Sequence, residues 1–167
     1  MNEPFPHCPW CGERFAPRQK WPRTCRGCGR ISFLNPLPVA VVVLPVDDGL
    51  LAVRRTIEPG LGELALPGGY VSIGETWQEG AARELFEETG IRIDPGEVES
   101  FRVATSPDDL DKLIVFGLAR PRRSDDLPDF AANEEAGERV VVDRKTPLAF
   151  PLHEEVVRAW FDLRGTG

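Results

Sequence analysis

The chain has 167 residues, enough for one compact α/β domain and a small accessory module but too few for two full domains. Apolar residues make up 41% and charged residues 28%, as in ordinary soluble globular proteins. The net charge of −7 disfavours non-specific nucleic-acid binding as the main role, because phosphate backbones repel an acidic protein. The sequence has no apolar run of about 20 residues that would span a bilayer and no signal-peptide pattern. We therefore expect no membrane partner and a cytoplasmic location.

Residues 1–35 are predicted to form a small metal-stapled module that precedes the main domain, residues 36–167. This segment holds all four cysteines, as Cys8-x2-Cys11 and, after thirteen further residues, Cys25-x2-Cys28. Two such knuckles place four thiolates around Zn²⁺ in a closed tetrahedral site, which is structural rather than catalytic. Two disulfides are the alternative, and cytoplasmic redox conditions disfavour them. We therefore expect a zinc ribbon.

The role of this ribbon is open between internal packing and contact with a partner. Its aromatic residues Trp10, Phe15 and Trp21 either pack the small core or stack on nucleic-acid bases. The segment is also locally basic, through Arg18, Lys20, Arg23, Arg26 and Arg30. Packing is favoured over nucleic-acid contact. A third option is that the ribbon packs against another subunit or closes over a substrate.

The sequence from residue 36 onward alternates strand and helix patterns, which predicts an α/β fold. Residues 35–38 are interpreted as a linker. We expect strands at 39–46 and 50–55, joined as a hairpin through a turn at 47–49, then a loop at 56–64. Another strand is expected at 65–71, broken by a glycine-rich bend. A helix is predicted at 75–89, capped by Gly90, with its inward residues being Trp77, Ala81, Ala82, Leu85 and Phe86.

The C-terminal part is predicted to complete the sheet and add a second helix. Strands at 98–104 and 112–119 flank an acidic turn at 106–111, and a loop is expected at 120–135. A short strand at 139–142 precedes a helix at 152–163, whose inward residues are Val156, Val157, Trp160 and Phe161. His153 is interpreted as an ordinary residue of that helix, and Tyr70 as packing beneath the glycine-rich bend.

Three carboxylates are grouped on the first predicted helix. Glu84 and Glu88 are four residues apart and share one helical face, with Glu87 beside them. Like charges at this spacing repel one another unless a cation offsets them. Oxygen ligands suit Mg²⁺ or Mn²⁺, with substrate phosphate completing the coordination. A solvated acidic helix face is the alternative interpretation.

The surrounding residues favour the metal site. The segment Gly69-x5-Glu75-x7-Arg83-Glu84-Leu85-Phe86-Glu87-Glu88-Thr89-Gly90-Ile91, preceded by Leu-Pro-Gly, resembles the complete Nudix box at every defined position. The resemblance implies an α/β/α sandwich around a mixed sheet, and a hydrolase that cuts phosphoanhydride bonds. It also implies that Glu84, Glu87 and Glu88 bind the metal, that Arg83 and Glu75 form a supporting ion pair, and that the Gly69 carbonyl is a further ligand.

The general base and the substrate contacts are less well defined by this resemblance. In the Nudix family the base lies either in the box helix or in a later loop, where Glu134 and Glu135 are the candidates here; ordinary solvated glutamates are the alternative. Arg54, Arg102 and Lys112 are candidate contacts for substrate phosphate or ribose, together with Gly69.

The resemblance implies a nucleotide pyrophosphatase. A four-cysteine ribbon directly before the box is similar to the NADH pyrophosphatase group over about residues 8–91, whereas residues 104–112 depart from that group. ADP-ribose, NADH, FAD and nucleotide sugars are the expected substrates. The rival hypothesis is a nucleotide-sensing or nucleic-acid-binding module that uses its ribbon for contact. A homodimer is expected by family analogy.

Overall fold

The computed structural model describes residues 5–106 and 111–165, so most of the predicted acidic turn at 106–111 lies outside the described residues. The chain divides into two compact units, residues 1–36 and residues 37–167. Within the described residues no helix is long and apolar enough to cross a membrane.

The N-terminal unit is a two-stranded ribbon with a very small core. Strands β1 (Arg23–Thr24) and β2 (Ile31–Ser32) pair antiparallel. Phe15 packs with the buried Cys8 and Cys25, and its ring meets Trp21 edge-on at 6.0 Å between centroids. Arg23 is buried with its guanidinium 4.2 Å from the Trp21 ring centroid, so the ribbon core contains a cation stacked on an aromatic ring.

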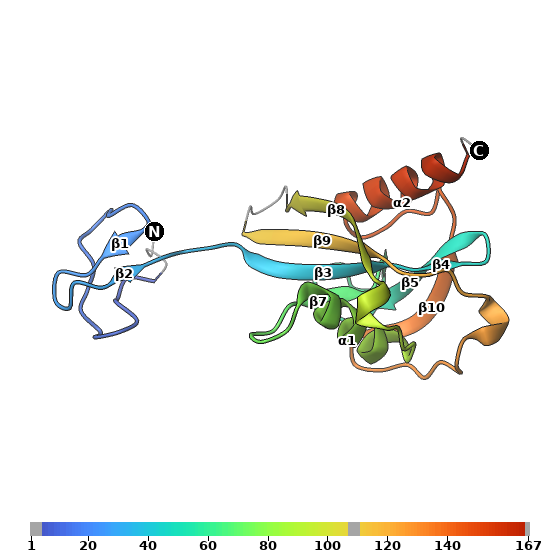
Figure 1. Ribbon diagram of the computed structural model, residues 1–167, viewed down its shortest axis with the longest axis horizontal. Helices are drawn as coiled ribbons and strands as arrows, with labels where there is room; N and C mark the ends of the chain where they lie inside the picture. Colours follow the sequence, from blue (N-terminus) through green and yellow to red (C-terminus); the bar gives the residue numbers. More distant parts are fainter. Residues whose placement is uncertain (1–4, 107–110, 166–167) are drawn as a thin grey trace. The chain divides into compact units, whose positions relative to one another are not determined.

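The C-terminal unit contains two sheets (Figure 1). The first sheet has the order β7 (Gly68–Tyr70), β3 (Leu37–Val43), β9 (Lys112–Leu118) and β8 (Glu99–Thr105). In this sheet β3 runs parallel to β9 and the other pairs are antiparallel, so it is mixed. The second sheet is antiparallel, with the order β10 (Ala136–Val142), β5 (Gly49–Arg55) and β4 (Pro45–Val46), and β6 (Leu64–Ala65) also pairs with β5.

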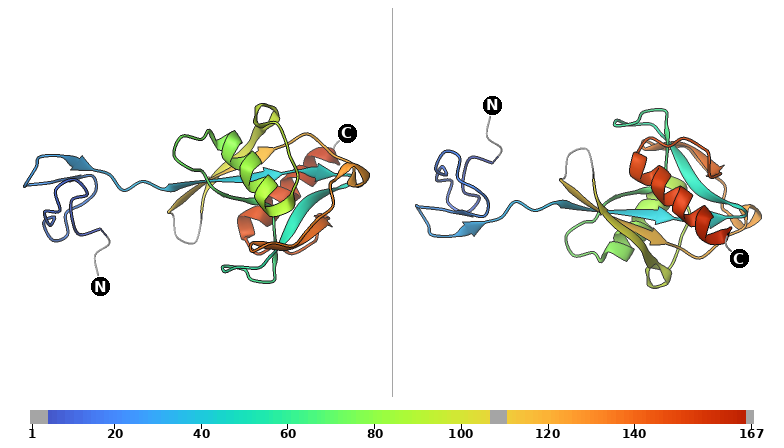
Figure 2. Two further views of the ribbon diagram at one scale, coloured as in Figure 1. Left: turned by 90° about the horizontal axis from the view of Figure 1, so that it is seen from below. Right: turned by 90° about the horizontal axis from the view of Figure 1, so that it is seen from above.

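Two helices cover opposite faces of the β structure. They are α1 (Trp77–Thr89) and α2 (Pro151–Arg164), and Figure 2 shows α1 in front from one side and α2 in front from the other. Two short 3-10 turns, η1 (Pro95–Glu97) and η2 (Ser124–Asp126), lie in the connections. This arrangement confirms the predicted α/β/α sandwich.

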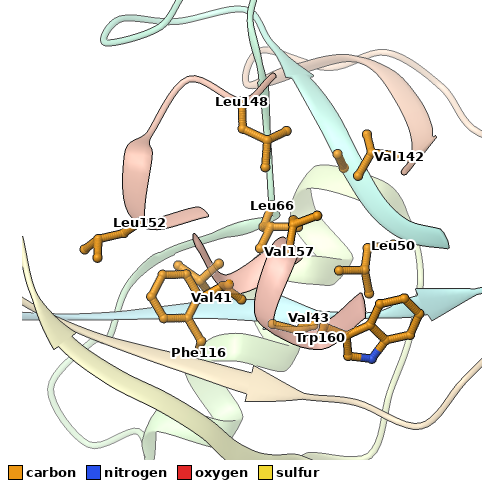
Figure 3. Packing of buried hydrophobic residues seen from close by; sticks show 12 residues of the cluster. Val41, Val43, Leu50, Leu66, Phe116, Val142, Leu148, Leu152, Val157 and Trp160 are labelled. Atoms are coloured by element: carbon orange, nitrogen blue, oxygen red, sulfur yellow. The ribbon is translucent and has the colours of Figure 1, made fainter. Parts of the chain in front are cut away.

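Alternation along β3 explains why the sandwich has two cores. Val41 and Val43 face the core that α2 closes with Val157 and Trp160 (Figure 3). The alternate residues, Ala40 and Val42, face the core that α1 closes, because successive strand residues point to opposite faces. A strand buried on both faces has no polar side chain along its interior, which accounts for the valine run.

Helix α1 begins and ends at well-defined caps. The Thr76 hydroxyl accepts from the Glu79 amide while the Glu79 carboxylate accepts from the Thr76 amide, which is a reciprocal capping box. Gly90 adopts a left-handed conformation at φ 74° and donates to the Phe86 carbonyl, which confirms the predicted C-cap. The helix therefore begins two residues later than predicted, leaving Glu75 in the preceding loop.

Several element predictions were wrong in instructive ways. The expected linker ends early, because β3 already begins at Leu37. The expected strand at 65–71 is two strands, since β6 pairs with β5 whereas β7 pairs with β3. Phe86 is 37% exposed and covered by the Arg92 guanidinium at 3.7 Å, rather than inward. Tyr70 is likewise 52% exposed.

His153 links α2 to the segment that leads into β7. Its Nδ1 accepts a hydrogen bond from the Leu66 amide at 3.1 Å, and its ring packs against Phe116 and Phe150. The residue is buried, and burial, with a smaller contribution from the charge of Arg55, lowers the pKa of His153 to about 3. It is therefore a neutral structural residue of α2, as interpreted from the sequence.

We predict a pH-dependent loss of stability that depends on His153. Because its folded pKa lies below its unfolded value of about 6.5, the unfolded state binds a proton first, so stability is complete above about pH 6.5 and falls toward pH 3. His153→Asn removes this proton uptake. It should cost about 2 kcal/mol at pH 7 through lost ring packing, yet show a shallower decline of Tm between pH 6.5 and 4. The exposed His7→Asn is the control, and parallel Tm profiles for His153→Asn and wild type would contradict the prediction.

Candidate active site

The site forms where the glycine-rich strand β7 crosses the box helix α1. The Gly68 amide donates a hydrogen bond to Glu88 Oε2 at 3.0 Å. At Gly69, a Cβ atom would lie 2.5 Å from the Glu84 carboxylate. Glycine at this position therefore lets the strand backbone approach the carboxylates more closely than any side chain would allow.

Arg83 gathers the acidic side chains on one side of the helix. Its Nε contacts Glu75 Oε1 at 2.6 Å, and its Nη1 contacts Glu84 at 2.8 Å and Glu87 at 2.9 Å. The second terminal nitrogen donates to the Tyr70 carbonyl at 2.9 Å. Hydrogen bonds from Arg83, together with the Ser72 amide, lower the pKa of Glu75 to about 2. Glu75 is therefore an ionised counter-charge that fixes Arg83 in place.

Three carboxylates, including the Glu84 that contacts Arg83, form a second cluster. Oxygen atoms of Glu84, Glu88 and Glu135 all lie within 4.8 Å of one another. Glu88 is only 4% exposed, and burial, reinforced by the charges of Glu84 and Glu135, raises its pKa to about 8. Burial also raises the pKa of Glu84 despite the adjacent Arg83.

This donor set fits a divalent cation. The raised pKa values show that nearby positive charge does not compensate these buried carboxylates for their lost hydration, and a bound hard cation would do so. Three carboxylate oxygens at this spacing suit Mg²⁺ or Mn²⁺, which prefer oxygen ligands. The structure therefore brings together two carboxylates from the box helix and one from the segment before β10.

Two other predicted acidic residues lie outside this group of three. Glu87 is exposed and ion-paired with Arg83. Glu134 is also exposed, and it is held through its backbone, because the Thr56 hydroxyl donates to its carbonyl at 2.5 Å. Of the two later-loop candidates, Glu135 is thus the one whose carboxylate reaches the cluster.

The cations predicted to contact substrate each contact a carboxylate. Arg54 pairs with Glu138 at 2.8 Å. Arg102 pairs with Glu155 of α2 at 2.7 Å, and Lys112 pairs with its neighbour Asp111 at 2.7 Å. A substrate phosphate would therefore compete with these acidic partners.

Arg55 is a site residue that the sequence analysis overlooked. Its charge makes a small contribution that lowers the pKa of the buried Glu88, after the larger effects of burial, of the Gly68 amide and of the neighbouring glutamates. Its Nε donates to the Pro59 carbonyl at 2.6 Å. The strand alternation offered a signal, because Arg54 and Arg55 must point to opposite faces of β5.

Asn133 is a second overlooked residue. It lies two positions before Glu135 and contacts the backbone of both its own loop and α1. The available signal was an asparagine just before two glutamates, since Asn side chains commonly close turns onto amides two residues ahead.

The four cysteines of the ribbon are arranged as a metal site. Cys8 Sγ lies 3.8 Å from Cys28 Sγ, and Cys11 Sγ lies 3.5 Å from Cys25 Sγ. All four sulfurs lie within 4.8 Å of one another. Tetrahedral Zn–S bonds of about 2.3 Å place sulfurs about 3.8 Å apart, whereas a disulfide requires about 2 Å. The cluster is therefore compatible with zinc and not with two disulfides.

We predict that Gly69→Ala weakens divalent-cation binding at least tenfold. The added methyl would displace the Glu84 carboxylate, and small misplacements of site groups have large effects. The measurement is Mn²⁺ titration followed by electron paramagnetic resonance, with Tm recorded in parallel. Gly165→Ala, whose Cβ would meet no atom closer than 3.6 Å, is the control. Unchanged Mn²⁺ affinity in a folded Gly69→Ala protein would contradict the prediction.

Comparisons with known proteins identify the family. The chain is 32% identical over 87 residues to the NAD-capped RNA hydrolase NudC of Edwardsiella ictaluri (strain 93-146); the match covers 52% of this chain but only 34% of that protein, so the chain spans about a third of this curated relative. A NUDIX hydrolase structure from Nitrosomonas europaea covers 96% of this chain and 93% of its own, with TM-score 0.76 and 23% identity.

A structure from Francisella tularensis, a bifunctional NMN adenylyltransferase/ADP ribose pyrophosphatase complexed with AMP and Mn ion, is also similar. It has TM-score 0.64 and 23% identity, and covers 78% of this chain and 42% of its own. Most directly, the profile of the NUDIX domain matches residues 36–163. The chain therefore belongs to the Nudix family.

Proposed function

We propose that this protein hydrolyses the phosphoanhydride bond of a nucleoside diphosphate linked to another group. The observation that carries the proposal is the cluster in which Glu84 and the buried Glu88 of an intact Nudix box meet Glu135 from a later loop. Glu87 completes the predicted Mg²⁺ or Mn²⁺ ligands, and the Gly69 carbonyl is a further one. When bound, the metal polarises a phosphoryl oxygen and neutralises the leaving phosphate.

The residues of the chain itself account for orientation and proton transfer. Arg83, fixed by the ionised Glu75, holds Glu84 and Glu87 in one geometry. Glu135 is exposed, and its carboxylate reaches the cluster, which makes it the preferred acceptor for the proton of the attacking water. The charge of Arg55 acts on Glu88, and Arg55 is a candidate contact for a substrate phosphate.

The substrate class follows from what the candidate molecules share. ADP-ribose, NADH, FAD and nucleotide sugars all carry a nucleoside joined through a pyrophosphate, and the similarity to a protein named as an NAD-capped RNA hydrolase supports this class. A structural zinc on Cys8, Cys11, Cys25 and Cys28 is part of the proposal, supported by the sulfur spacing. The proposal also includes a cytoplasmic location and a homodimeric assembly.

We predict that Glu87→Gln lowers kcat about a hundredfold with Mg²⁺, equivalent to about 2.7 kcal/mol of transition-state stabilisation. The reason is the loss of one anionic ligand together with its ion pair to Arg83. The measurement is the rate at which nucleotide products are released from ADP-ribose, NADH, FAD, a dinucleoside polyphosphate and a nucleotide sugar. Glu99→Gln, an exposed glutamate of β8, is the matched control. A Glu87→Gln protein that works at the wild-type rate would show that the metal assignment is wrong.

A second candidate function, nucleic-acid contact through the ribbon, is favoured by one observation. Trp10 does not pack the ribbon core as expected; it is 61% exposed, with the Arg30 guanidinium 4.7 Å from its ring centroid. An exposed aromatic ring beside a guanidinium is a surface on which bases stack. Charge is also segregated, since residues 1–36 contain six basic and two acidic side chains in a protein of net charge −7.

This candidate predicts salt-sensitive binding of a short single-stranded RNA by the full chain. Trp10→Ala should weaken that binding at least fivefold, because one base–aromatic stack contributes about 1–3 kcal/mol, while hydrolysis of free NADH stays unchanged. Fluorescence anisotropy at two salt concentrations measures it, with the exposed Leu163→Ala as control. RNA binding that is absent, or equal in both variants, would leave the ribbon as a packing module.

A further inference from the structure

Asn133 joins the segment that carries Glu135 to the end of the box helix. Its Nδ2 donates to the Glu87 carbonyl at 3.0 Å and to the Glu88 carbonyl at 3.3 Å. Its Oδ1 accepts from the Glu135 amide at 3.0 Å and from the Ala136 amide at 2.9 Å. One side chain therefore connects the end of the box helix, at Glu87 and Glu88, to the backbone of Glu135.

The opposite side of the Glu135 peptide is held as well. Its carbonyl accepts from the Thr56 amide at 3.1 Å, at the end of β5. The turn is closed by the Asn133 amide, which donates to the Ala136 carbonyl at 2.9 Å. Both backbone polar groups of Glu135 are thus satisfied, and these bonds fix the direction in which its side chain leaves the backbone.

We propose that Asn133 is a positioning residue that holds Glu135 at the cation site, and that this one amide sets the affinity of the site for a divalent cation. The inference rests on the proposed function, because it takes the cluster to be a metal site. Glu135 is exposed and lies on a connection rather than on a helix. Without the Asn133 amide, the backbone that carries Glu135 would be freer to move, and binding a cation would then cost the entropy of fixing it.

The donor half of the side chain distinguishes this role from simple turn formation. An asparagine that only closed a turn would need Oδ1 alone, whereas here Nδ2 contacts the carbonyls of the helix. These carbonyls belong to the last turn of α1, where α-helices leave such groups without intrahelical partners. Asn133 thus satisfies helix-end acceptors and fixes the loop with the same group.

The test is direct Mn²⁺ binding to the full chain, measured by the electron paramagnetic resonance of free Mn²⁺, with no substrate present. The variants are Asn133→Ala, Glu135→Gln and the double variant. Asn133→Asp is included because it keeps the oxygen acceptor but loses the amide donor. The matched control is Asp143→Ala. It removes a similar turn contact outside the site, in which Asp143 Oδ1 accepts from the Lys145 amide at 2.9 Å. Tm of the metal-free proteins is recorded for each.

The expected result is about tenfold weaker Mn²⁺ binding for Asn133→Ala and for Asn133→Asp, the usual effect of losing a group that orients a metal ligand. Glu135→Gln should lose at least as much. The double variant should bind no more weakly than Glu135→Gln alone, because Asn133 acts through Glu135 and the two effects are not additive. Asp143→Ala should bind Mn²⁺ like the wild type.

Two kinds of failure are distinguishable. If the wild type binds Mn²⁺ and Asn133→Ala binds it equally well, or if the effects in the double variant are additive, the positioning role is wrong while the proposed function stands. Wild-type affinity in Asn133→Asp would also overturn it, since the donor would then be dispensable. If the wild type fails to bind Mn²⁺, both the metal site and the role of Asn133 are overturned.

Discussion

The burial of the Glu88 carboxylate between α1 and β7 is the constraint on which the rest of the site depends. A buried carboxylate loses several kcal/mol of hydration unless hydrogen bonds and a cation replace it. Here one hydrogen bond comes from the Gly68 amide, and the charges of Glu84 and Glu135 add repulsion. The resulting pKa of about 8 means that the cluster without a cation gains a proton near neutral pH, so cations and protons compete for the same oxygens.

The scaffold around Glu88 works against this repulsion. Glycine-rich strand β7 permits the close approach, and β7 is in turn hydrogen-bonded to the buried strand β3. His153 fixes Leu66 just before this strand, so α2 supports a site that lies on the α1 side of the sandwich. Arg83 shares one positive charge among Glu75, Glu84 and Glu87, so only one member of the cluster pairs with it in these contacts. Residues from both helices and both sheets therefore hold the carboxylates in place.

The parts of the site that were predictable from sequence are those governed by local periodicity. Glu84 and Glu88 share a helical face because they are four residues apart. Gly90 ends the helix because this position has a left-handed backbone conformation, which glycine adopts readily. The approach of Glu135 is different, since it depends on β10 pairing with β5. No local pattern separates Glu134 from Glu135. Only the Glu135 carboxylate reaches the cluster, because Asn133 and Thr56 fix the backbone around these residues.

Substrate selection is also hard to infer from sequence, because the partners of a basic residue can lie far from it in the chain. A lone basic residue in a sequence suggests a phosphate contact, but Arg54 and Arg102 are each paired with a glutamate far away in the chain. An exposed ion pair of this kind contributes at most about 1 kcal/mol, so a substrate phosphate can displace it at little cost. Arg54 and Arg102 therefore stay candidate contacts for a substrate phosphate despite their ion pairs. What distinguishes Arg55 is that its charge already acts on Glu88, in the cluster where the proposed reaction would place the cleaved phosphate.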